Sequence, residues 1–267
     1  MFRRTLVVLL MVAIAFTASA GKRRAIATPS LWNGLTPGPV PIGFKGWLLR
    51  AQASEFHHGP QHLVQVNVWY PAIANGGTAM TFRDYVLLKT TENTYDEPTD
   101  ATRQAALSEF RGPQVLLDTP MLARLNSPTP INVTRSPIVF FAVDEGESPA
   151  DVAVLAEFIA SHGYIVVTTP SVTRLTANDA AARAQEQADD IDRAASAIGD
   201  WPNAVNVPVS VVGAGLGLEA ARLYATQHPV NLVLDRTAPA EGILQQLNAV
   251  WDSSTLTAEF LQNRNSE

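Results

Sequence analysis

Short apolar runs alternate with helical stretches through the second half of this chain. The runs have the composition of buried strands, and they cover residues 138–142, 164–168, 207–212 and 230–234. Between them, the apolar spacing predicts helices over 149–161, 177–198 and 218–226. Two short helices are expected after the last run, at 241–251 and 255–262. Strands separated by helices of this length form right-handed βαβ units with a parallel sheet. The sequence therefore predicts an α/β fold with a mostly parallel sheet and flanking helices.

The first half of the chain is less regular. Residues 21–45 are rich in Pro and Gly and read as an extended leader, and residues 64–70 alternate as a strand does. Short helices are expected at 83–88 and 101–110. Because 267 residues suit one large α/β domain, we assign 21–126 to its leader and first strands, and 127–267 to its βαβ core.

The first twenty residues have the pattern of a secretory signal peptide. Arg3 and Arg4 precede an apolar run over 6–16, and Ala18-Ser19-Ala20 fits the small-residue cleavage rule. The apolar run is shorter than the roughly 20 residues of a membrane-spanning helix. We therefore expect cleavage before Gly21, export to the periplasm or the medium, and no membrane span in the mature chain.

The charge and cysteine content exclude several classes of function. Without residues 1–20, the chain keeps 17 basic and 25 acidic residues, a formal charge of −8. It has no basic stripe, so nucleic acid is not an expected partner. The absence of cysteine excludes disulfides, thiolate metal sites and a cysteine nucleophile. No cofactor is expected.

A glycine-rich turn lies between the run at 207–212 and the helix that follows it. Residues 213–217 read Gly-Ala-Gly-Leu-Gly. Gly213 and Gly217 have the spacing of the outer glycines in a G-x-S-x-G nucleophile elbow, a strand–turn–helix motif that presents a catalytic serine. The central position is Gly215, which has no side chain to attack a carbonyl.

Several segments resemble one group of α/β-hydrolases. They are Pro37-Gly38-Pro39-Val40-Pro41-Ile42-Gly43-Phe44, Val68-Trp69-Tyr70-Pro71-Ala72, Met80-Thr81-Phe82-Arg83-Asp84-Tyr85-Val86, and the stretch from Leu155 to Ser171. In this order they are similar to the platelet-activating-factor acetylhydrolases and dienelactone-hydrolase-like esterases. The resemblance covers most of residues 37–238 and implies an α/β-hydrolase-like fold.

The resemblance also implies where a catalytic triad and an oxyanion hole would lie. Such enzymes hydrolyse esters with a serine, a histidine and a carboxylate, while backbone N–H groups bind the oxyanion. Gly215 takes the nucleophile position, and the N–H of Leu216 is one oxyanion donor. The second donor would come from the loop that begins at Val143. Asp235, which ends the run at 230–234, fits the place of the triad acid.

This chain departs from that pattern at several positions. The serine is replaced by Gly215, and Asp144 and Glu145 would oppose an oxyanion electrostatically. No histidine follows His228, so the chain resembles a degenerate, C-terminally truncated member of the group. We therefore expect a catalytically impaired protein that binds a small ester or a lipid in the former substrate crevice.

Two other functions remain open. One is an active esterase that uses an unorthodox nucleophile. The other is FAD or NAD binding through residues 213–218, because Asp235 follows Gly213 by 22 residues, as the ribose-binding acid of a dinucleotide site does. Against this second reading, Leu218 stands where the third glycine of that motif is needed.

Three further expectations concern metals and assembly. Asp144, Glu145 and Glu147 are weak candidates for a metal site, and solvated loop charge is the favoured reading of them. His57, His58 and His62 are a still weaker group. If the run at 230–234 is the last strand, it forms an exposed sheet edge, and we expect a homodimer through that edge.

Overall fold

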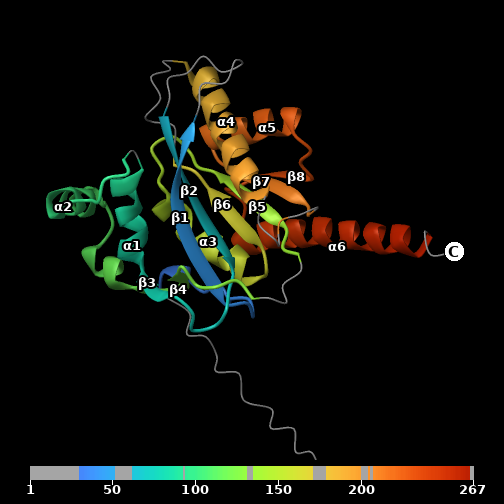
Figure 1. Ribbon diagram of the computed structural model, residues 1–267, viewed down its shortest axis with the longest axis horizontal. Coiled ribbons are helices and arrows are strands. Elements are labelled where there is room, and N and C mark those ends of the chain that lie inside the picture. The colour runs from blue at the N-terminus through green and yellow to red at the C-terminus, as the bar shows by residue number, and fades with distance from the viewer. Residues whose placement is uncertain are drawn as a thin grey trace, which may run out of the picture.

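The computed structural model forms one mixed sheet of eight strands with helices on both faces (Figure 1). It describes residues 30–51, 62–92, 94–130, 135–170, 179–199, 204 and 207–264, with the backbone alone at 30, 51, 62 and 253–264. The strand order is β3-β4-β1-β2-β6-β5-β7-β8. The expected α/β class is confirmed.

The second half supplies the parallel part of the sheet. Its strands are β5 (Ile138–Ala142), β6 (Ile165–Thr168), β7 (Val209–Gly213) and β8 (Leu232–Asp235). Strand β5 pairs in parallel with both β6 and β7, and β7 pairs in parallel with β8. These strands fall on the four apolar runs of the sequence.

The first half adds four strands on the other side of β6. They are β1 (Ile42–Ala51), β2 (His62–Pro71), β3 (Thr78–Thr81) and β4 (Pro120–Leu125). Strand β2 matches the alternating run at 64–70, whereas β1 begins inside the segment that was predicted to be an extended leader. Gly43 and the prolines before it gave that segment the composition of a loop, but ten residues of β1 pair with β2 and hold the strand in the sheet.

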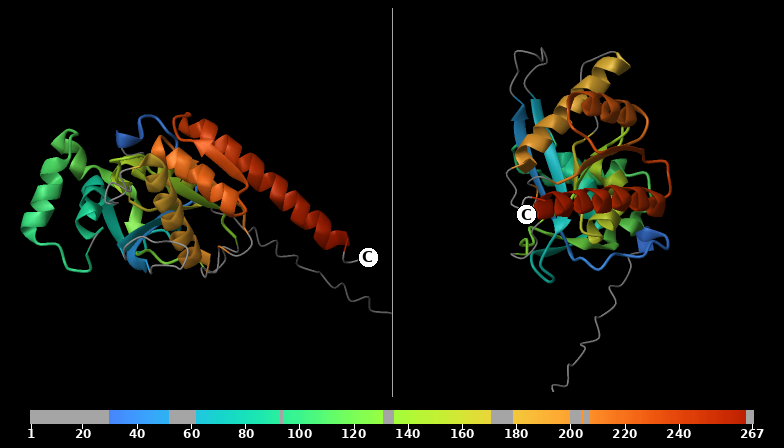
Figure 2. Two further views of the ribbon diagram at one scale, coloured as in Figure 1. Left: turned by 90° about the horizontal axis from the view of Figure 1, so that it is seen from above. Right: turned by 90° about the vertical axis from the view of Figure 1, so that its right-hand side faces the viewer.

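Helices cover both faces of the sheet and leave a hydrophobic core on each side (Figure 2). Helix α3 (Pro149–Ser161) packs on one face together with α1 (Phe82–Leu87) and the start of α6 (Ala240–Arg264). Helices α4 (Ala180–Gly199) and α5 (Leu216–Gln227) cover the other face. The remaining helical segments are η1 (Ser30–Trp32), η2 (Leu88–Thr91), α2 (Asp100–Glu109) and η3 (Gln114–Asp118).

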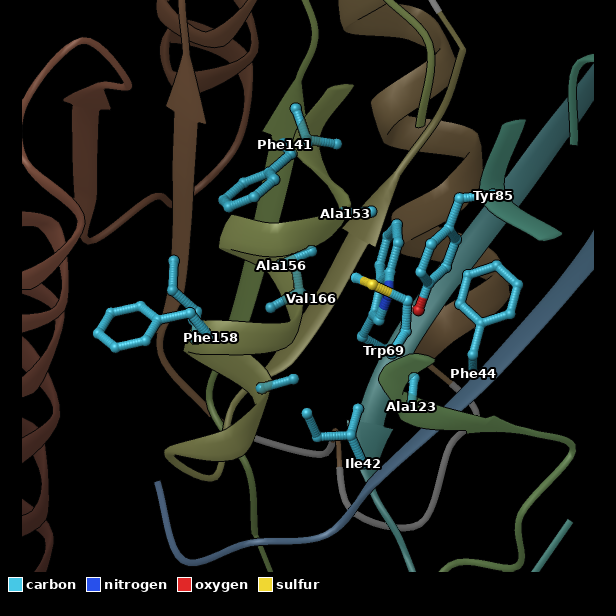
Figure 3. Close-up of a cluster of buried hydrophobic side chains, with 14 of the residues drawn as sticks. Ile42, Phe44, Trp69, Tyr85, Ala123, Phe141, Ala153, Ala156, Phe158 and Val166 are labelled. Atoms are coloured by element: carbon cyan, nitrogen blue, oxygen red, sulfur yellow. The ribbon is translucent and has the colours of Figure 1, made fainter. Parts of the chain in front are cut away.

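Helix α3 forms because its sequence supplies a start signal and a continuous apolar face. Ser148 caps its N-terminus in a capping box with Asp151, and Pro149 occupies the first turn. Ala153 and Ala156 let the helix approach the sheet closely (Figure 3). Phe158 packs edge-on against Trp32. This packing places α3 against β2 and β6 of the sheet.

A buried carboxylate joins α3 to strand β4. Glu157 is fully buried, and its two oxygens accept hydrogen bonds from the backbone N–H of Leu122 at 2.9 Å and of Ala123 at 3.0 Å. The hydroxyl of Tyr85 also donates to Glu157 at 2.7 Å and accepts from the indole N–H of Trp69 at 2.9 Å. Strand β4 pairs with β1 through two residue pairs. Glu157 therefore satisfies donors of β4 that sheet pairing leaves free.

The C-terminal segment differs from its expected form. Two short helices were predicted at 241–251 and 255–262, but α6 runs without a break from Ala240 to Arg264, and its C-terminal half extends away from the sheet (Figure 2). Ile243 and Leu247 anchor its first turns in the core. The residues between the two expected helices contain neither Gly nor Pro, so nothing interrupts the helix. Strand β8 is the last strand of the sheet.

Candidate functional site at the glycine turn

The register of the sheet brings three strand ends into one row. Ala142 of β5 lies beside Gly213 of β7, and Gly213 lies beside Asp235 of β8. The loops that follow these residues therefore meet at the carboxyl edge of the parallel strands. In open α/β sheets this edge is where ligands bind.

The two outer glycines of the turn permit a very close approach of backbones. A Cβ atom at Gly213 would lie 2.6 Å from the carbonyl oxygen of Gly217. A Cβ atom at Gly217 would overlap with the backbone of Ala142 and would lie 2.7 Å from the carbonyl oxygen of Val143. Glycine is thus required at both positions, and the turn joins strand β7 directly to helix α5.

Gly215 occupies the tip of this turn, directly before α5. Its φ of 51° and ψ of −125° are strained for any residue with a side chain. A Cβ atom built at this position would overlap with both carboxylate oxygens of Asp144. A side chain at position 215 and the Asp144 carboxylate therefore exclude each other.

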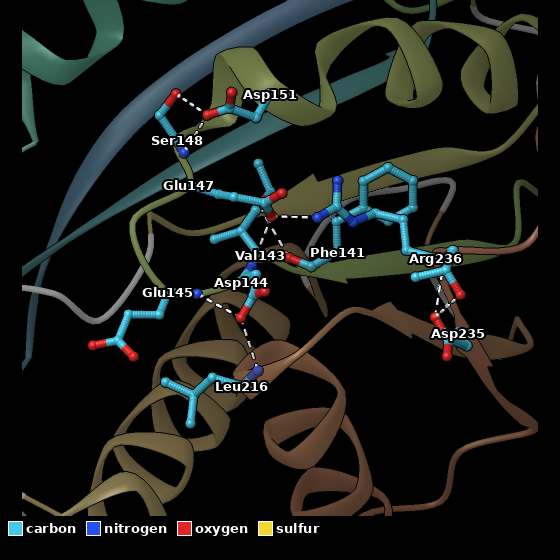
Figure 4. A network of polar contacts seen from close by, with 12 residues as sticks. Phe141, Val143, Asp144, Glu145, Glu147, Ser148, Asp151, Leu216, Asp235 and Arg236 are labelled. Carbon is cyan, nitrogen blue, oxygen red and sulfur yellow. Dashed lines mark hydrogen bonds and ion pairs between the residues drawn. The ribbon is translucent and has the colours of Figure 1, made fainter. Parts of the chain in front are cut away.

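Asp144 reaches this position from the loop after β5 (Figure 4). Its Oδ1 atom accepts hydrogen bonds from the backbone N–H of Leu216 at 2.8 Å and from that of Glu145 at 2.7 Å. The N–H of Leu216, which the resemblance assigned to an oxyanion, is thus bound to a carboxylate of the protein itself. Val143 is fully buried, and its carbonyl oxygen accepts from the Nε2 of Gln187 at 2.8 Å.

The other acidic residues of this loop bind arginines. Glu147 forms an ion pair with Arg236 and accepts the N–H of Asp144 at 2.8 Å. Glu145 lies 3.3 Å from the guanidinium of Arg183 on α4. Groups of at least three His, Cys, Asp or Glu side chains placed to hold a metal ion are absent from the described part of the chain.

Arg236 belongs to the site although sequence reasoning missed it. Its backbone N–H donates to the carbonyl oxygen of Gly213 at 2.8 Å, and its side chain, 15% exposed, reaches Glu147. The sequence signal was present, since Arg236 directly follows the candidate acid Asp235. The sequence did not point to Arg236 because a Ser-His-carboxylate triad needs a carboxylate at the carboxyl edge of the sheet and has no role for a cation there.

Asp235 itself is turned toward its own loop (Figure 4). Its Oδ1 atom accepts hydrogen bonds from the backbone N–H and the hydroxyl of Thr237, both at 2.8 Å. These hydrogen bonds lower the pKa of Asp235 below its ordinary value, and the nearby Arg222 and Arg236 add to the effect. Its contacts are those of a turn residue in solvent.

The described histidines lie at helix ends remote from the turn. His162 caps the C-terminus of α3, and its Nδ1 lies 2.8 Å from the carbonyl oxygen of Phe158. His228 stacks on Tyr224 at the C-terminus of α5, one helix length away from Gly215. His57 and His58 lie outside the described residues, and His62 is described by its backbone alone.

Comparison with known proteins identifies a solved structure with a similar fold. No family model and no curated protein matches the sequence. Among solved structures, a ferulic acid esterase from Streptomyces cinnamoneus is similar, with a TM-score of 0.53 and 17% sequence identity. The match covers 72% of this chain and 57% of the esterase chain, so this chain spans less than two thirds of that structure. The expected α/β-hydrolase-like fold is confirmed, and at this identity the similarity extends to the fold alone.

Within the described residues, none of the helices has the length and apolar character needed to cross a membrane.

Proposed function

We propose that this protein is a non-catalytic member of the α/β-hydrolase fold, related to carboxylic-ester hydrolases of the platelet-activating-factor acetylhydrolase and dienelactone-hydrolase-like group. One observation carries the proposal. The Asp144 carboxylate fills the space of a nucleophile side chain at Gly215 and binds the N–H of Leu216. The turn therefore offers neither a nucleophile nor a free oxyanion donor.

The expected cost to catalysis is large. Loss of the nucleophile or of the general base of a serine hydrolase lowers kcat on the order of 10⁶-fold. The Asp144 carboxylate also lies where the oxyanion of a tetrahedral intermediate would form. Repulsion between these two negative charges disfavours the transition state. No described histidine side chain lies beside Gly215 to act as the base. Binding without turnover is the role that this site supports.

The two alternatives find less support in this geometry. An active esterase would need another serine as its nucleophile, but Ser148, in the loop after β5, donates from Oγ to Asp151 at 2.8 Å and caps α3. Ser171 lies outside the described residues. A dinucleotide would need the N–H groups that open α5 for its pyrophosphate. Asp144 already holds the N–H of Leu216, and its charge would repel a phosphate.

Ester hydrolysis by the purified protein tests the proposal. We expect no turnover of p-nitrophenyl acetate above the buffer rate, and no labelling by a fluorophosphonate probe. Gly215→Ser alone should stay inactive, because Asp144 competes with the new side chain and no base is in place. The matched double variant Gly215→Ser, Asp144→Ala removes the competition and should still lack burst kinetics. Turnover abolished by the probe in the unmodified protein would overturn the proposal.

Two further expectations stand as proposals. Export is tested by the N-terminal sequence of the secreted protein, which should begin at Gly21. A homodimer through β8 is supported by the terminal place of this strand in the sheet and by the lack of any charge in residues 230–234. Light scattering should give twice the monomer mass, and Val233→Lys on the same strand should give the monomer mass.

A further inference from the structure

Residues 46–50 of strand β1 form an open edge of the sheet, the β1 edge. Strand β4 lies on this side of β1 but pairs with it only as far as Phe44. The carbonyl oxygen of Phe44 points away from β2, since it accepts an N–H from the residue after β4 at 2.8 Å. Backbone groups alternate in direction along an antiparallel pair, so those of Gly46, Leu48 and Arg50 point to the same side. Within the described part of the chain, no backbone group pairs with them there.

Side chains at the β1 edge combine apolar surface with positive charge. Trp47 and Leu49 are half-buried and pack against the core on the side of α4 and α5. Arg50 is exposed, as is Lys45, whose ammonium lies 5.9 Å from the centre of the Trp47 ring. Open edges pair with other extended chains, and basic residues on them oppose pairing between two identical copies. The β1 edge therefore fits an extended segment of another protein that carries a carboxylate.

A buried acceptor lies directly beside this edge. Asn67 on β2 pairs with Gly46 of β1 and is fully buried. Its Nδ2 donates to Gln65 at 3.0 Å, whereas its Oδ1 accepts no hydrogen bond from any group in the described part of the chain. A Cβ atom at Gly46 would lie 3.1 Å from this Oδ1, and its next described neighbours would be 3.8 and 4.0 Å away. Because Gly46 is exposed and has no side chain, a donor from the open side can cross it and reach the unpaired oxygen.

We propose that the β1 edge binds an extended peptide of another protein, with Arg or Lys opposite Gly46. The peptide pairs with the outward backbone groups of Gly46, Leu48 and Arg50 and so adds a strand to the sheet. Its basic residue extends across Gly46 and donates to Asn67 Oδ1. Adjacent strands lie about 4.8 Å apart, a distance that Arg and Lys side chains span and that shorter donors do not. Three strands separate β1 from β7, so this surface is distinct from the glycine turn.

Antiparallel pairing, the more stable arrangement, sets the remaining residues of the peptide. The residue four positions before the basic one lies opposite Arg50 on the same face, so a carboxylate is expected there. The three residues between them lie opposite residues 47–49 and should be apolar. The probe is therefore a peptide with the sequence Glu-Val-Leu-Val-Arg, extended by Gly-Ser at each end. Its matched control has norleucine in place of Arg.

Nuclear magnetic resonance titration of the isotope-labelled protein tests the proposal. The Arg peptide should shift the amide signals of Gly46, Leu48 and Arg50 in a saturable way, because their N–H groups gain an acceptor. The norleucine peptide should shift the same signals but bind roughly threefold to tenfold more weakly, the effect of one hydrogen bond to a buried acceptor.

Two variants separate the pairing of strands from the recognition of Arg. Gly46→Ala places a methyl group 3.1 Å from Asn67 Oδ1 and blocks the route to it, so this variant should bind the two peptides equally. Leu48→Pro removes an N–H at the open edge, where proline is tolerated, and should bind neither peptide. Leu48→Thr is its control, since it retains the N–H and should keep the preference for Arg.

Several results would overturn the proposal. The absence of saturable shifts at residues 46–50, or unchanged binding by folded Leu48→Pro, would exclude strand pairing at the β1 edge. Equal binding of the two peptides by the unmodified protein would exclude the role of Asn67. A lower mass of Leu48→Pro than of the unmodified protein in light scattering would assign the β1 edge to a second copy of this chain. If Leu48→Pro fails to fold, N-methylation of the central Leu of the peptide removes a hydrogen bond of the same residue pair and should abolish binding.

Discussion

Two carboxylates in this protein each accept two backbone N–H groups, but they lie in opposite environments. Glu157 is fully buried between α3 and β4, and it also accepts the hydroxyl of Tyr85. Asp144 is half-buried on a loop at the carboxyl edge of the sheet. The same interaction holds two elements of the core together at one place and fills the glycine turn at the other.

The two sites differ in which other hydrogen-bond acceptor can reach the N–H groups when the carboxylate withdraws. If Glu157 withdraws, the N–H groups of Leu122 and Ala123 remain in the core, where water does not replace it. If Asp144 withdraws, water or a ligand reaches the N–H of Leu216. The fully buried carboxylate of Glu157 is therefore structural, whereas the half-buried carboxylate of Asp144, on the same kind of donor pair, is replaceable.

The largest expected effect is at Glu157. Glu157→Ala leaves two backbone donors and the Tyr85 hydroxyl without their acceptor, so the free energy of unfolding should fall by roughly 3–5 kcal/mol. Asp144→Ala should lower it by about 1 kcal/mol. Urea denaturation measures both. Equal losses in the two variants would break the distinction drawn between the two carboxylates.

Gly217→Ala should have the next largest effect. Its methyl group would overlap with the backbone of Ala142, and a backbone clash is relieved only by moving α5 away from β5. We expect a loss of about 2–3 kcal/mol in the free energy of unfolding. Gly242→Ala on α6 is the matched control, since nothing lies within 4 Å of its added Cβ. There, higher helix propensity should raise stability by about 0.5–1 kcal/mol.

A double-mutant cycle at Gly215 and Asp144 comes third. Gly215→Ala should cost about 1–3 kcal/mol through its strained φ and the displaced Asp144 carboxylate. With Asp144→Ala already present, the displacement no longer contributes, and the cost should fall by about 1 kcal/mol. Additive losses would show that the Asp144 carboxylate and a side chain at position 215 do not compete for one space.

The smallest effect is a dependence on pH. Burial raises the pKa of Glu157 above its ordinary value near 4.5, although hydrogen bonds from Ala123, Leu122 and Tyr85 oppose the shift. The folded state thus keeps this proton at pH values where the unfolded chain has lost it. The resulting stabilisation is complete below pH 4.5 and declines as pH rises through the folded pKa.

Glu157→Gln removes that titration. The free energy of unfolding of the variant should therefore decline less between pH 4.5 and 7 than that of the unmodified protein. Chemical denaturation at several pH values measures the two slopes. Identical slopes would show that a group other than Glu157 causes the pH dependence of stability.

The sequence predicted the parallel half of the fold well because its signals are local. Four apolar runs and their intervening amphipathic stretches predicted β5 to β8 and α3 to α5, and Gly213 and Gly217 marked the turn between β7 and α5. It predicted β1, β3 and β4 poorly. Strand β1 contains glycines, β3 has four residues, and β4 depends on Glu157, which lies 34 and 35 residues away from its two partners.

The sequence by itself determined that position 215 carries no nucleophile and that no histidine follows His228. Only the tertiary structure decided what replaces the missing side chain. The register of β5 and β7 places the loop after Ala142 beside the turn after Gly213. The Asp144 carboxylate therefore accepts the N–H of Leu216, 72 residues away in sequence. The local sequence determines which residues form the turn. Which side chain fills the space at Gly215 depends on the pairing of strands that are distant in sequence.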